Sequence, residues 1–221
     1  MSTSRLETIE IETAPSPSAS IIWLHGLGAD GNDFAPIVPE IDLGDIAVRY
    51  VFPNAPTMPV TVNNGYVMRA WYDISDAAIR REDEAGVRAS QAAIETLMTR
   101  EKTRGIAARR IVLAGFSQGG AIALFAGLRH AERIAGIMAL STYVPLADKL
   151  AAEAQPINRD LPVFMAHGSD DTVIPITRAA QSRALLEQQG YALEWHQYRM
   201  PHSVCPAELG DIQSWLRKVL A

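Results

Sequence analysis

A serine flanked by glycines two positions away on either side is the strongest chemical signal in the sequence. The pattern G-x-S-x-G occurs at residues 115–119, GFSQG. In this motif a sharp turn exposes a serine hydroxyl that can attack a carbonyl carbon. A buried-strand pattern, Ile111 to Ala114, precedes it, and an alanine-rich helix pattern, Ala121 to Leu128, follows it. Because a nucleophile elbow needs this strand–turn–helix context, we predict that Ser117 is a nucleophile for acyl transfer.

A serine nucleophile needs a base to remove its proton and a carboxylate to orient that base. Of the five histidines, only His202 follows the last predicted strand, Tyr191 to Tyr198, so it is the candidate base. The loop after the strand at 161–166 carries Asp170 and Asp171, and either could face the histidine. The chain order serine, aspartate, histidine is one of the orders that serine hydrolases use.

Donors for the developing oxyanion are expected from two backbone N–H groups. His25 and Gly26 follow the predicted strand Ser20 to Leu24, and a His-Gly loop in this position supplies one N–H group in hydrolases with such an elbow. We therefore assign the oxyanion hole to the backbone N–H groups of Leu27 and Gln118.

The same early loop supports an alternative function from another class. Gly26, Gly28 and Gly31 spell G-x-G-x-x-G, the fingerprint of nucleotide-binding oxidoreductases. That fingerprint also needs an acidic residue at the end of the next strand. The strand at 48–52 ends in proline and asparagine instead. A non-catalytic scaffold of the same fold is the third hypothesis, although no member of the candidate triad is missing.

Strands that alternate with helices must position these residues. Strands are predicted at 6–11, 20–24, 48–52, 111–114, 135–140, 161–166 and 191–198, and helices at 33–39, 84–103, 121–128, 176–189 and 207–220. This alternation predicts one α/β domain over residues 1–221, with a mainly parallel sheet covered by helices on both faces. The candidate residues follow strands, so they should share the rim at the carboxyl ends of the sheet.

Residues 53–82 interrupt the alternation, with three prolines and an Asn-Asn-Gly turn signal. We predict an irregular, lid-like loop near the active site. Met68, Trp71 and Tyr72 are candidates for lining an acyl pocket, and the alternative is that they only pack the loop onto the body of the protein.

Composition excludes several classes of protein. The 221 residues are 48% hydrophobic and 20% charged with a net charge of −5, so neither a nucleic-acid footprint nor a polybasic membrane patch is expected. Cys205 is the single cysteine and cannot form an intramolecular disulfide. The first 20 residues are polar, which leads us to expect a cytoplasmic protein without a signal peptide. The spacing of possible ligands suggests no metal, and we expect no cofactor.

Five short motifs together resemble the phospholipase/carboxylesterase family, which includes acyl-protein thioesterases. They are LHGLG at 24–28, WYD at 71–73, GFSQGG at 115–120, HG at 167–168 with Asp171 ahead of Pro175, and PH at 201–202. The resemblance spans nearly the whole chain. It implies an α/β-hydrolase fold without a large cap domain, which cleaves small-molecule carboxylic esters or thioesters and often forms homodimers.

The resemblance also implies the triad Ser117, Asp171 and His202, because family members place the acid four residues before the proline that opens the next helix. Two positions depart from the eukaryotic thioesterases. Thr172 stands where those proteins carry proline, and Tyr72 stands where phenylalanine is common. Both departures are similar to bacterial carboxylesterases. A serine carboxylesterase is the leading hypothesis, because the elbow is accompanied by a candidate base and a candidate acid.

Overall fold

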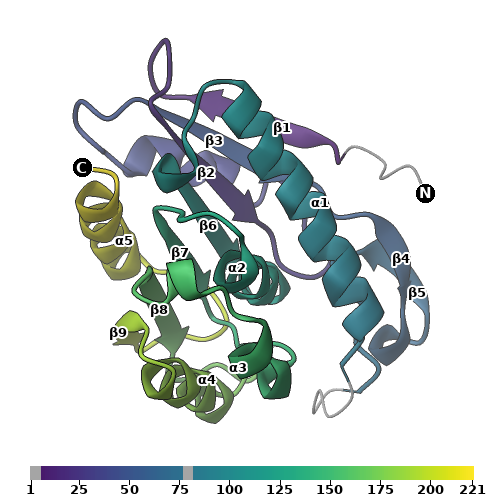
Figure 1. Cartoon of the computed structure of the whole chain (residues 1–221). Helices are drawn as coiled ribbons and strands as arrows, with labels where there is room; N and C mark the ends of the chain where they lie inside the picture. The colour runs from purple at the N-terminus through teal and green to yellow at the C-terminus, as the bar shows by residue number, and fades with distance from the viewer. Residues whose placement is uncertain (1–5, 77–81) are drawn as a thin grey trace.

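The computed structural model describes residues 6–76 and 82–221. Its centre is a seven-stranded sheet with the strand order β1-β3-β2-β6-β7-β8-β9 (Figure 1). The strands are β1 (Thr8–Glu12), β2 (Ala19–Leu24), β3 (Val48–Pro53), β6 (Ile111–Phe116), β7 (Gly136–Leu140), β8 (Pro162–Gly168) and β9 (Ala192–Tyr198). Only β1 is antiparallel to its neighbour. The carboxyl ends of the other strands therefore share one edge.

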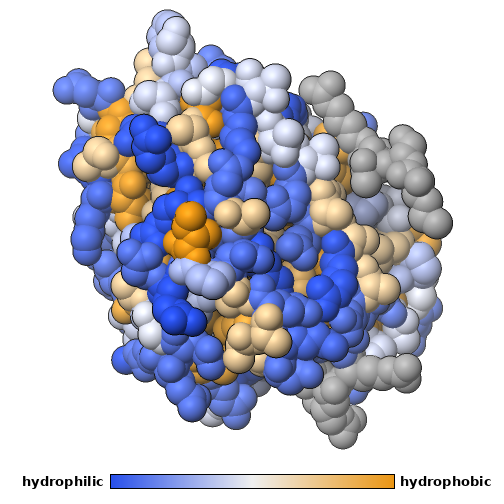
Figure 2. Space-filling model, viewed as in Figure 1, coloured by the Kyte–Doolittle hydropathy of each residue, from blue (hydrophilic) through white to orange (hydrophobic). Residues whose placement is uncertain are grey.

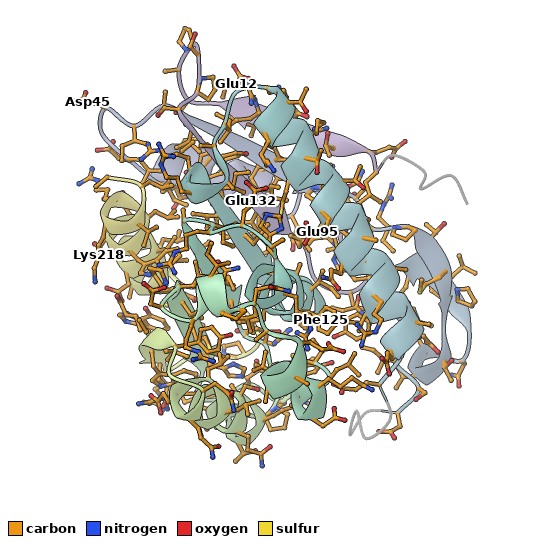
Figure 3. The ribbon with its side chains drawn as sticks, in the orientation of Figure 1. Glu12, Asp45, Glu95, Phe125, Glu132 and Lys218 are labelled. Carbon is orange, nitrogen blue, oxygen red and sulfur yellow. The ribbon has the colours of Figure 1, made fainter. Side chains whose placement is uncertain are left out.

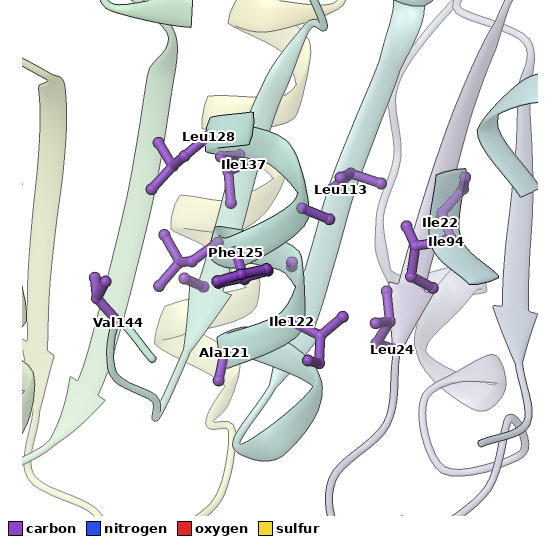
Figure 4. Close-up of a cluster of buried hydrophobic side chains, with 14 of the residues drawn as sticks. Ile22, Leu24, Ile94, Leu113, Ala121, Ile122, Phe125, Leu128, Ile137 and Val144 are labelled. Atoms are coloured by element: carbon purple, nitrogen blue, oxygen red, sulfur yellow. The ribbon is translucent and has the colours of Figure 1, made fainter. Parts of the chain in front are cut away.

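Helices cover both faces of this sheet. The α-helices are α1 (Glu84–Thr103), α2 (Gln118–Arg129), α3 (Leu150–Glu153), α4 (Ile176–Gln188) and α5 (Pro206–Val219). Apolar residues of α1 to α4 share one core cluster (Figure 4), while α5 and the 3-10 helix η1 (Ala35–Glu40) pack into a second. Along β2, Ile22 and Leu24 belong to the first cluster, and Ile21 and Trp23 belong to the second. This period of two is what a strand buried on both faces requires.

Local sequence explains why α1 begins and ends where it does. The Asp83 carboxylate accepts a hydrogen bond from Gly86 N at 3.0 Å and so caps the first turn. Val87, Ile94 and Leu97 recur at helical spacing and are buried against the sheet. Gly105, with φ of +95°, follows the helix, and this left-handed conformation ends helices.

Charged and polar side chains dominate the face of the molecule shown in Figure 2, and apolar side chains are scattered among them. Glu95 and Glu132 lie on this face (Figure 3). Glu95 is hydrogen-bonded to the His130 ring, and Glu132 forms an ion pair with Lys102. Among the described residues, no helix is both long and apolar enough to cross a membrane.

The predicted α/β-hydrolase architecture is confirmed, with a mostly parallel sheet, helices on both faces and no large cap within residues 6–76 and 82–221. The segment 33–39 differs from its prediction, because Pro36 and Pro39 lie in a 3-10 helix rather than an α-helix. Proline lacks the N–H group that an α-helix interior needs.

The prediction of an irregular loop is wrong for residues 57–69, which form a two-stranded hairpin. Its strands are β4 (Thr57–Val60) and β5 (Tyr66–Arg69), joined through the 3-10 helix η2 (Thr61–Asn63). Asn64 and Gly65 both have positive φ, 56° and 75°, as tight hairpin turns require. Residues 77–81 of the predicted loop lie outside the described residues.

Candidate active site

Ser117 occupies a strained turn between β6 and α2. Its φ is +54° and its ψ is −121°, a combination that few residues other than glycine adopt. The end of β7 and the loop after it hold this turn. Ser117 N donates to Leu140 O at 2.9 Å, and the Thr142 hydroxyl donates to Ser117 O at 2.6 Å. The backbone on either side of the candidate nucleophile is therefore fixed by the neighbouring strand.

The glycines of the motif allow three pieces of backbone to meet at the turn. A Cβ atom on Gly115 would lie 2.3 Å from Gly119 O, and one on Gly119 would lie 2.4 Å from Leu24 O. Both distances are too short for real atoms. Only glycine fits at the two positions, which explains the spacing of G-x-S-x-G in this chain.

Asp171 and His202 meet at the ends of β8 and β9. His202 Nδ1 lies 2.7 Å from Asp171 Oδ2, and the Asp171 side chain is fully buried. An ionised carboxylate can only accept hydrogen bonds. Nδ1 therefore carries the proton, which leaves Nε2 free to act as a base. The His202 ring packs against Phe116 with centroids 4.7 Å apart, which places the imidazole beside the residue that precedes Ser117.

The loop after β8 distinguishes its two aspartates. Oδ1 of Asp171 accepts hydrogen bonds from Val173 N and Ile174 N at 2.8 and 2.9 Å. Asp170 is exposed, and its carboxylate contacts Ser169 Oγ at 3.2 Å. The structure therefore brings Asp171, and not Asp170, to the histidine.

His25 orients the peptide that carries the first proposed oxyanion donor. Ala55 N donates to His25 Nε2 at 3.0 Å, so Nδ1 is the protonated nitrogen, and it lies 2.6 Å from Gly26 O. Burial lowers the pKa of His25 and favours this neutral tautomer. The carbonyl of Gly26 and the N–H of Leu27 belong to one trans peptide and point in opposite directions. Anchoring the carbonyl thereby fixes the direction of the Leu27 N–H group.

The two predicted oxyanion donors are unengaged within the described part of the chain. Neither Leu27 N nor Gln118 N donates to another described residue, whereas the adjacent amides of Gly28 and Ser117 bond to Arg69 O and Leu140 O. Gln118 is also the first residue of α2. Its N–H group lies at the positive end of the helix dipole, where negative charge is stabilised.

A clamp built on the Gln118 side chain joins the elbow to the segment after β5. Gln118 Oε1 accepts from Trp71 N at 2.8 Å, and Gln118 Nε2 donates to Tyr72 O at 2.7 Å. Trp71 Nε1 in turn donates to His25 O at 2.9 Å. This clamp could not be predicted from the sequence, because the G-x-S-x-G motif carries no information about the side chain at its second variable position.

A cavity of about 230 Å³ opens beside Ser117. Its lining residues are Leu27, Val62, Asn63, Tyr72, Ile74, Ser117, Gln118, Tyr143, Val173 and Ile174. A larger hollow of about 560 Å³ between Lys102 and Ile157 contains none of the candidate triad. Six residues of the smaller cavity were not predicted as site residues, because they come from segments far apart in the sequence: Val62, Asn63, Ile74, Tyr143, Val173 and Ile174.

The three predicted pocket residues have different surroundings. Tyr72 lines the cavity. Trp71 is 1% exposed and packs beneath the loop after β2, against His25, rather than in the cavity wall. Met68 lies against the same loop, with its sulfur 3.6 Å from the position a Cβ atom would take on Gly28. For Trp71, this position agrees with the alternative that it packs the segment onto the body of the protein.

The glycine-rich loop lacks the geometry of a dinucleotide site. Helix η1 begins at Ala35, so Gly31 is not at a helix start as the fingerprint demands. Gly31 N instead donates to the Asn54 side chain at 2.8 Å, and a Cβ atom there would lie 2.7 Å from Phe52 O. The absence of a side chain at Gly31 therefore allows close contact with the end of β3. Among the described residues no group of three or more His, Cys, Asp or Glu side chains could hold a metal ion.

The sequence is similar to proteins of one family. The sequence pattern of the phospholipase/carboxylesterase family matches residues 6–220. Acyl-protein thioesterase 1 of Gibberella zeae is 37% identical, with 100% of this chain and 98% of that protein covered. The corresponding protein of Neurospora crassa is 40% identical over 92% of this chain and 87% of that protein.

Solved structures of several proteins have a fold similar to that of this chain. Arabidopsis thaliana SOBER1 superposes with a TM-score of 0.87 at 29% identity, covering 92% of this chain and 99% of that one. Zea mays acyl-protein thioesterase 2 gives 0.87 at 26% identity, covering 97% and 99%. The Bacillus cereus carboxylesterase shares the fold with a TM-score of 0.77, 18% identity and coverage of 98% and 95%.

Proposed function

The chain belongs to the phospholipase/carboxylesterase family, a family of ester and thioester hydrolases, and from that premise we propose that it works through an acyl-enzyme on Ser117. His202 is the general base and Asp171 orients it. The observation that carries this proposal is the 2.7 Å contact between His202 Nδ1 and the buried Asp171 carboxylate. It leaves the basic nitrogen of a neutral imidazole available beside the elbow.

The proposed reaction has two steps. Ser117 Oγ attacks the carbonyl carbon while His202 Nε2 takes the hydroxyl proton. The tetrahedral oxyanion is stabilised by the N–H groups of Leu27 and Gln118, and its collapse expels the alcohol or thiol, which His202 protonates. Water then attacks the acyl-enzyme by the same route and releases the carboxylic acid.

The substrate class follows from the cavity and from the relatives. The cavity beside Ser117 is lined mainly by apolar side chains, which suit the acyl part of a substrate. Its volume of about 230 Å³ lies below the roughly 300 Å³ at which pockets for drug-sized ligands begin. We therefore propose short acyl groups, carried as thioesters or as oxygen esters. Several relatives are named acyl-protein thioesterases, which supports the thioester.

Active-site labelling tests the proposal directly. A fluorophosphonate should form one covalent adduct with the folded protein, located at Ser117 by peptide mass spectrometry. Ser117→Ala should abolish both the adduct and the hydrolysis of short-chain p-nitrophenyl esters and acyl thioesters. Ser214 is exposed on α5, and Ser214→Ala should leave both unchanged. Folded wild-type protein that neither labels nor hydrolyses any of these substrates would refute the proposal.

A further inference from the structure

Two phenol groups meet in the wall of the active-site cavity. Tyr72 Oη and Tyr143 Oη lie 2.7 Å apart, although the residues are 71 positions apart in the sequence. Both side chains are almost fully buried, with 1% and 2% exposure, and both line the cavity that contains Ser117. The Tyr72–Tyr143 pair is thus part of the surface that an acyl group would contact.

Counting protons shows that this pair has one donor to spare. Each neutral phenol has one O–H donor and can also accept. Burial raises the pKa of Tyr143 to about 12 and the pKa of Tyr72 well above its usual value, so both are protonated at neutral pH. One proton makes the shared hydrogen bond. Within the described residues, the second O–H group has no acceptor besides its partner hydroxyl.

Among the described residues, neither hydroxyl is hydrogen-bonded to the nearby carboxylate of Glu82, which accepts from Leu146 N at 2.8 Å. The guanidinium carbon of Arg178 lies 3.9 Å from the ring centroid of Tyr143 and so contacts the ring face. Ile74, Val173 and Ile174 from the same cavity wall are apolar. A buried donor without an acceptor is unfavourable, and an occupant of the cavity can supply one.

We propose that the Tyr72–Tyr143 pair binds an oxygen atom within the acyl chain, so that the preferred substrates are esters or thioesters of short acids with an ether, keto or hydroxyl oxygen. This inference rests on the proposed function, because it assumes that the acyl group enters this cavity. Water can satisfy the spare donor in the free protein, and a substrate oxygen can replace that water. A plain alkyl chain displaces the water and leaves the donor unpaired. This should lower kcat/KM for such a substrate on the order of tenfold or more.

The test is a comparison of matched esters on the wild-type protein. One series holds p-nitrophenyl hexanoate and analogues in which an ether oxygen replaces, in turn, each CH2 of the acyl chain except the one bonded to the carbonyl carbon. Each kcat/KM is divided by the rate of hydroxide-catalysed hydrolysis of the same ester, which removes the inductive effect of the oxygen. At one chain position the ether should be favoured over hexanoate by about tenfold or more.

Variants then test whether the two tyrosine hydroxyls cause the preference for the ether substrate. Tyr72→Phe combined with Tyr143→Phe removes both hydroxyls and should bring the ratio to within about twofold of one, while fluorophosphonate labelling of Ser117 persists. Tyr66 is 70% exposed on the hairpin, and Tyr66→Phe should keep the wild-type ratio. Equal normalised rates for every wild-type substrate, or an unchanged ratio in the double variant, would overturn the inference. Wild-type protein that hydrolyses none of the esters would instead refute the proposed function.

Discussion

Oδ2 of Asp171 lies 2.7 Å from Nδ1 of His202, while Oδ1 of the same carboxylate accepts two backbone N–H groups of its own loop. The loop thus fixes the rotation of the carboxylate before the histidine binds to it. A preset acid of this kind holds the imidazole in the tautomer that a general base needs.

Replacing this acid should therefore lower catalysis without unfolding the protein. Asp171→Asn lets an amide N–H group face the imidazole and favours the wrong tautomer, so kcat should fall on the order of 10⁴-fold. Asp170→Asn is the matched control, since Asp170 is exposed and its side chain contacts Ser169 rather than the histidine, and it should change kcat by less than about threefold. Steady-state kinetics on one p-nitrophenyl ester measures both. A large loss at Asp170 with a nearly active Asp171 variant would reverse the assignment.

The second prediction concerns His25, which acts through the Leu27 peptide. His25→Ala removes the group that anchors Gly26 O, so the Leu27 N–H group loses its fixed direction. Loss of one oxyanion donor typically lowers kcat by about 10²–10³-fold with little change in KM. His196→Ala, on β9, is the control and should keep kcat within about twofold of wild type. Equal kinetics for the two variants would show that His25 is not needed to orient the donor.

The third prediction separates cavity-lining residues from buried support. Val62 lines the cavity, so Val62→Ala should enlarge it and raise the relative rate for longer acyl chains. Trp71 is buried and hydrogen-bonded to His25 O, so Trp71→Ala should instead lower the free energy of unfolding by about 3–5 kcal/mol. Rates over esters of increasing chain length and urea unfolding measure the two effects. A changed chain-length profile at full stability for Trp71→Ala would show that it lines the site.

The fourth prediction is a pH dependence of stability caused by Glu208. This side chain is fully buried in the first turn of α5, and burial raises its pKa from 4.5 to about 8. Between these two values the unfolded chain has lost the proton that the folded protein still holds. Stability from this group is thus complete below pH 4.5 and is lost as pH rises to about 8, by about 3–5 kcal/mol.

Glu208→Gln should remove this part of the pH dependence, because glutamine does not titrate. The difference in unfolding free energy between the variant and wild type should therefore grow in favour of the variant from pH 5 to pH 8. Glu40 is exposed, and Glu40→Gln should run parallel to wild type. Parallel urea-unfolding curves for Glu208→Gln and wild type across this range would contradict a raised carboxyl pKa.

Much of the fold could be predicted from sequence because a buried parallel strand produces an apolar run that is easy to recognise. The run at 111–114 and the alanine-rich segment after it correspond to β6 and α2. The hairpin of β4 and β5 was missed because Pro56 and Pro59 suggested an irregular loop. Pro59 is tolerated because β4 lies in a two-stranded sheet, where one side of each strand is an edge. Asn64-Gly65, a strong hairpin signal, could have identified it.

The site was predictable where a residue type is dictated by chemistry and less so where it depends on packing. Ser117 and His202 follow from their types and their places after strands, and their catalytic roles stay predictions, as do a homodimer and a cytoplasmic location. Residue type and position alone left Asp170 and Asp171 open, and the family resemblance was needed to favour Asp171. The cavity wall could not be derived, because contacts such as Tyr72 with Tyr143 join segments whose distance in space is set by the whole sheet.

The pairing of two central strands also bears on when the site forms during folding. β2 pairs with β6 so that Leu24 lies opposite Gly115. This pairing sets the loop that carries Leu27 beside the elbow. These residues are far apart in the chain, and loop-closure entropy makes such long-range parallel pairing slow. Helices α1 and α2 can form from local contacts before this pairing exists. We therefore expect the strand pairing that unites the two halves of the site to form late in folding, so that a newly made chain should become active only after its central sheet has formed.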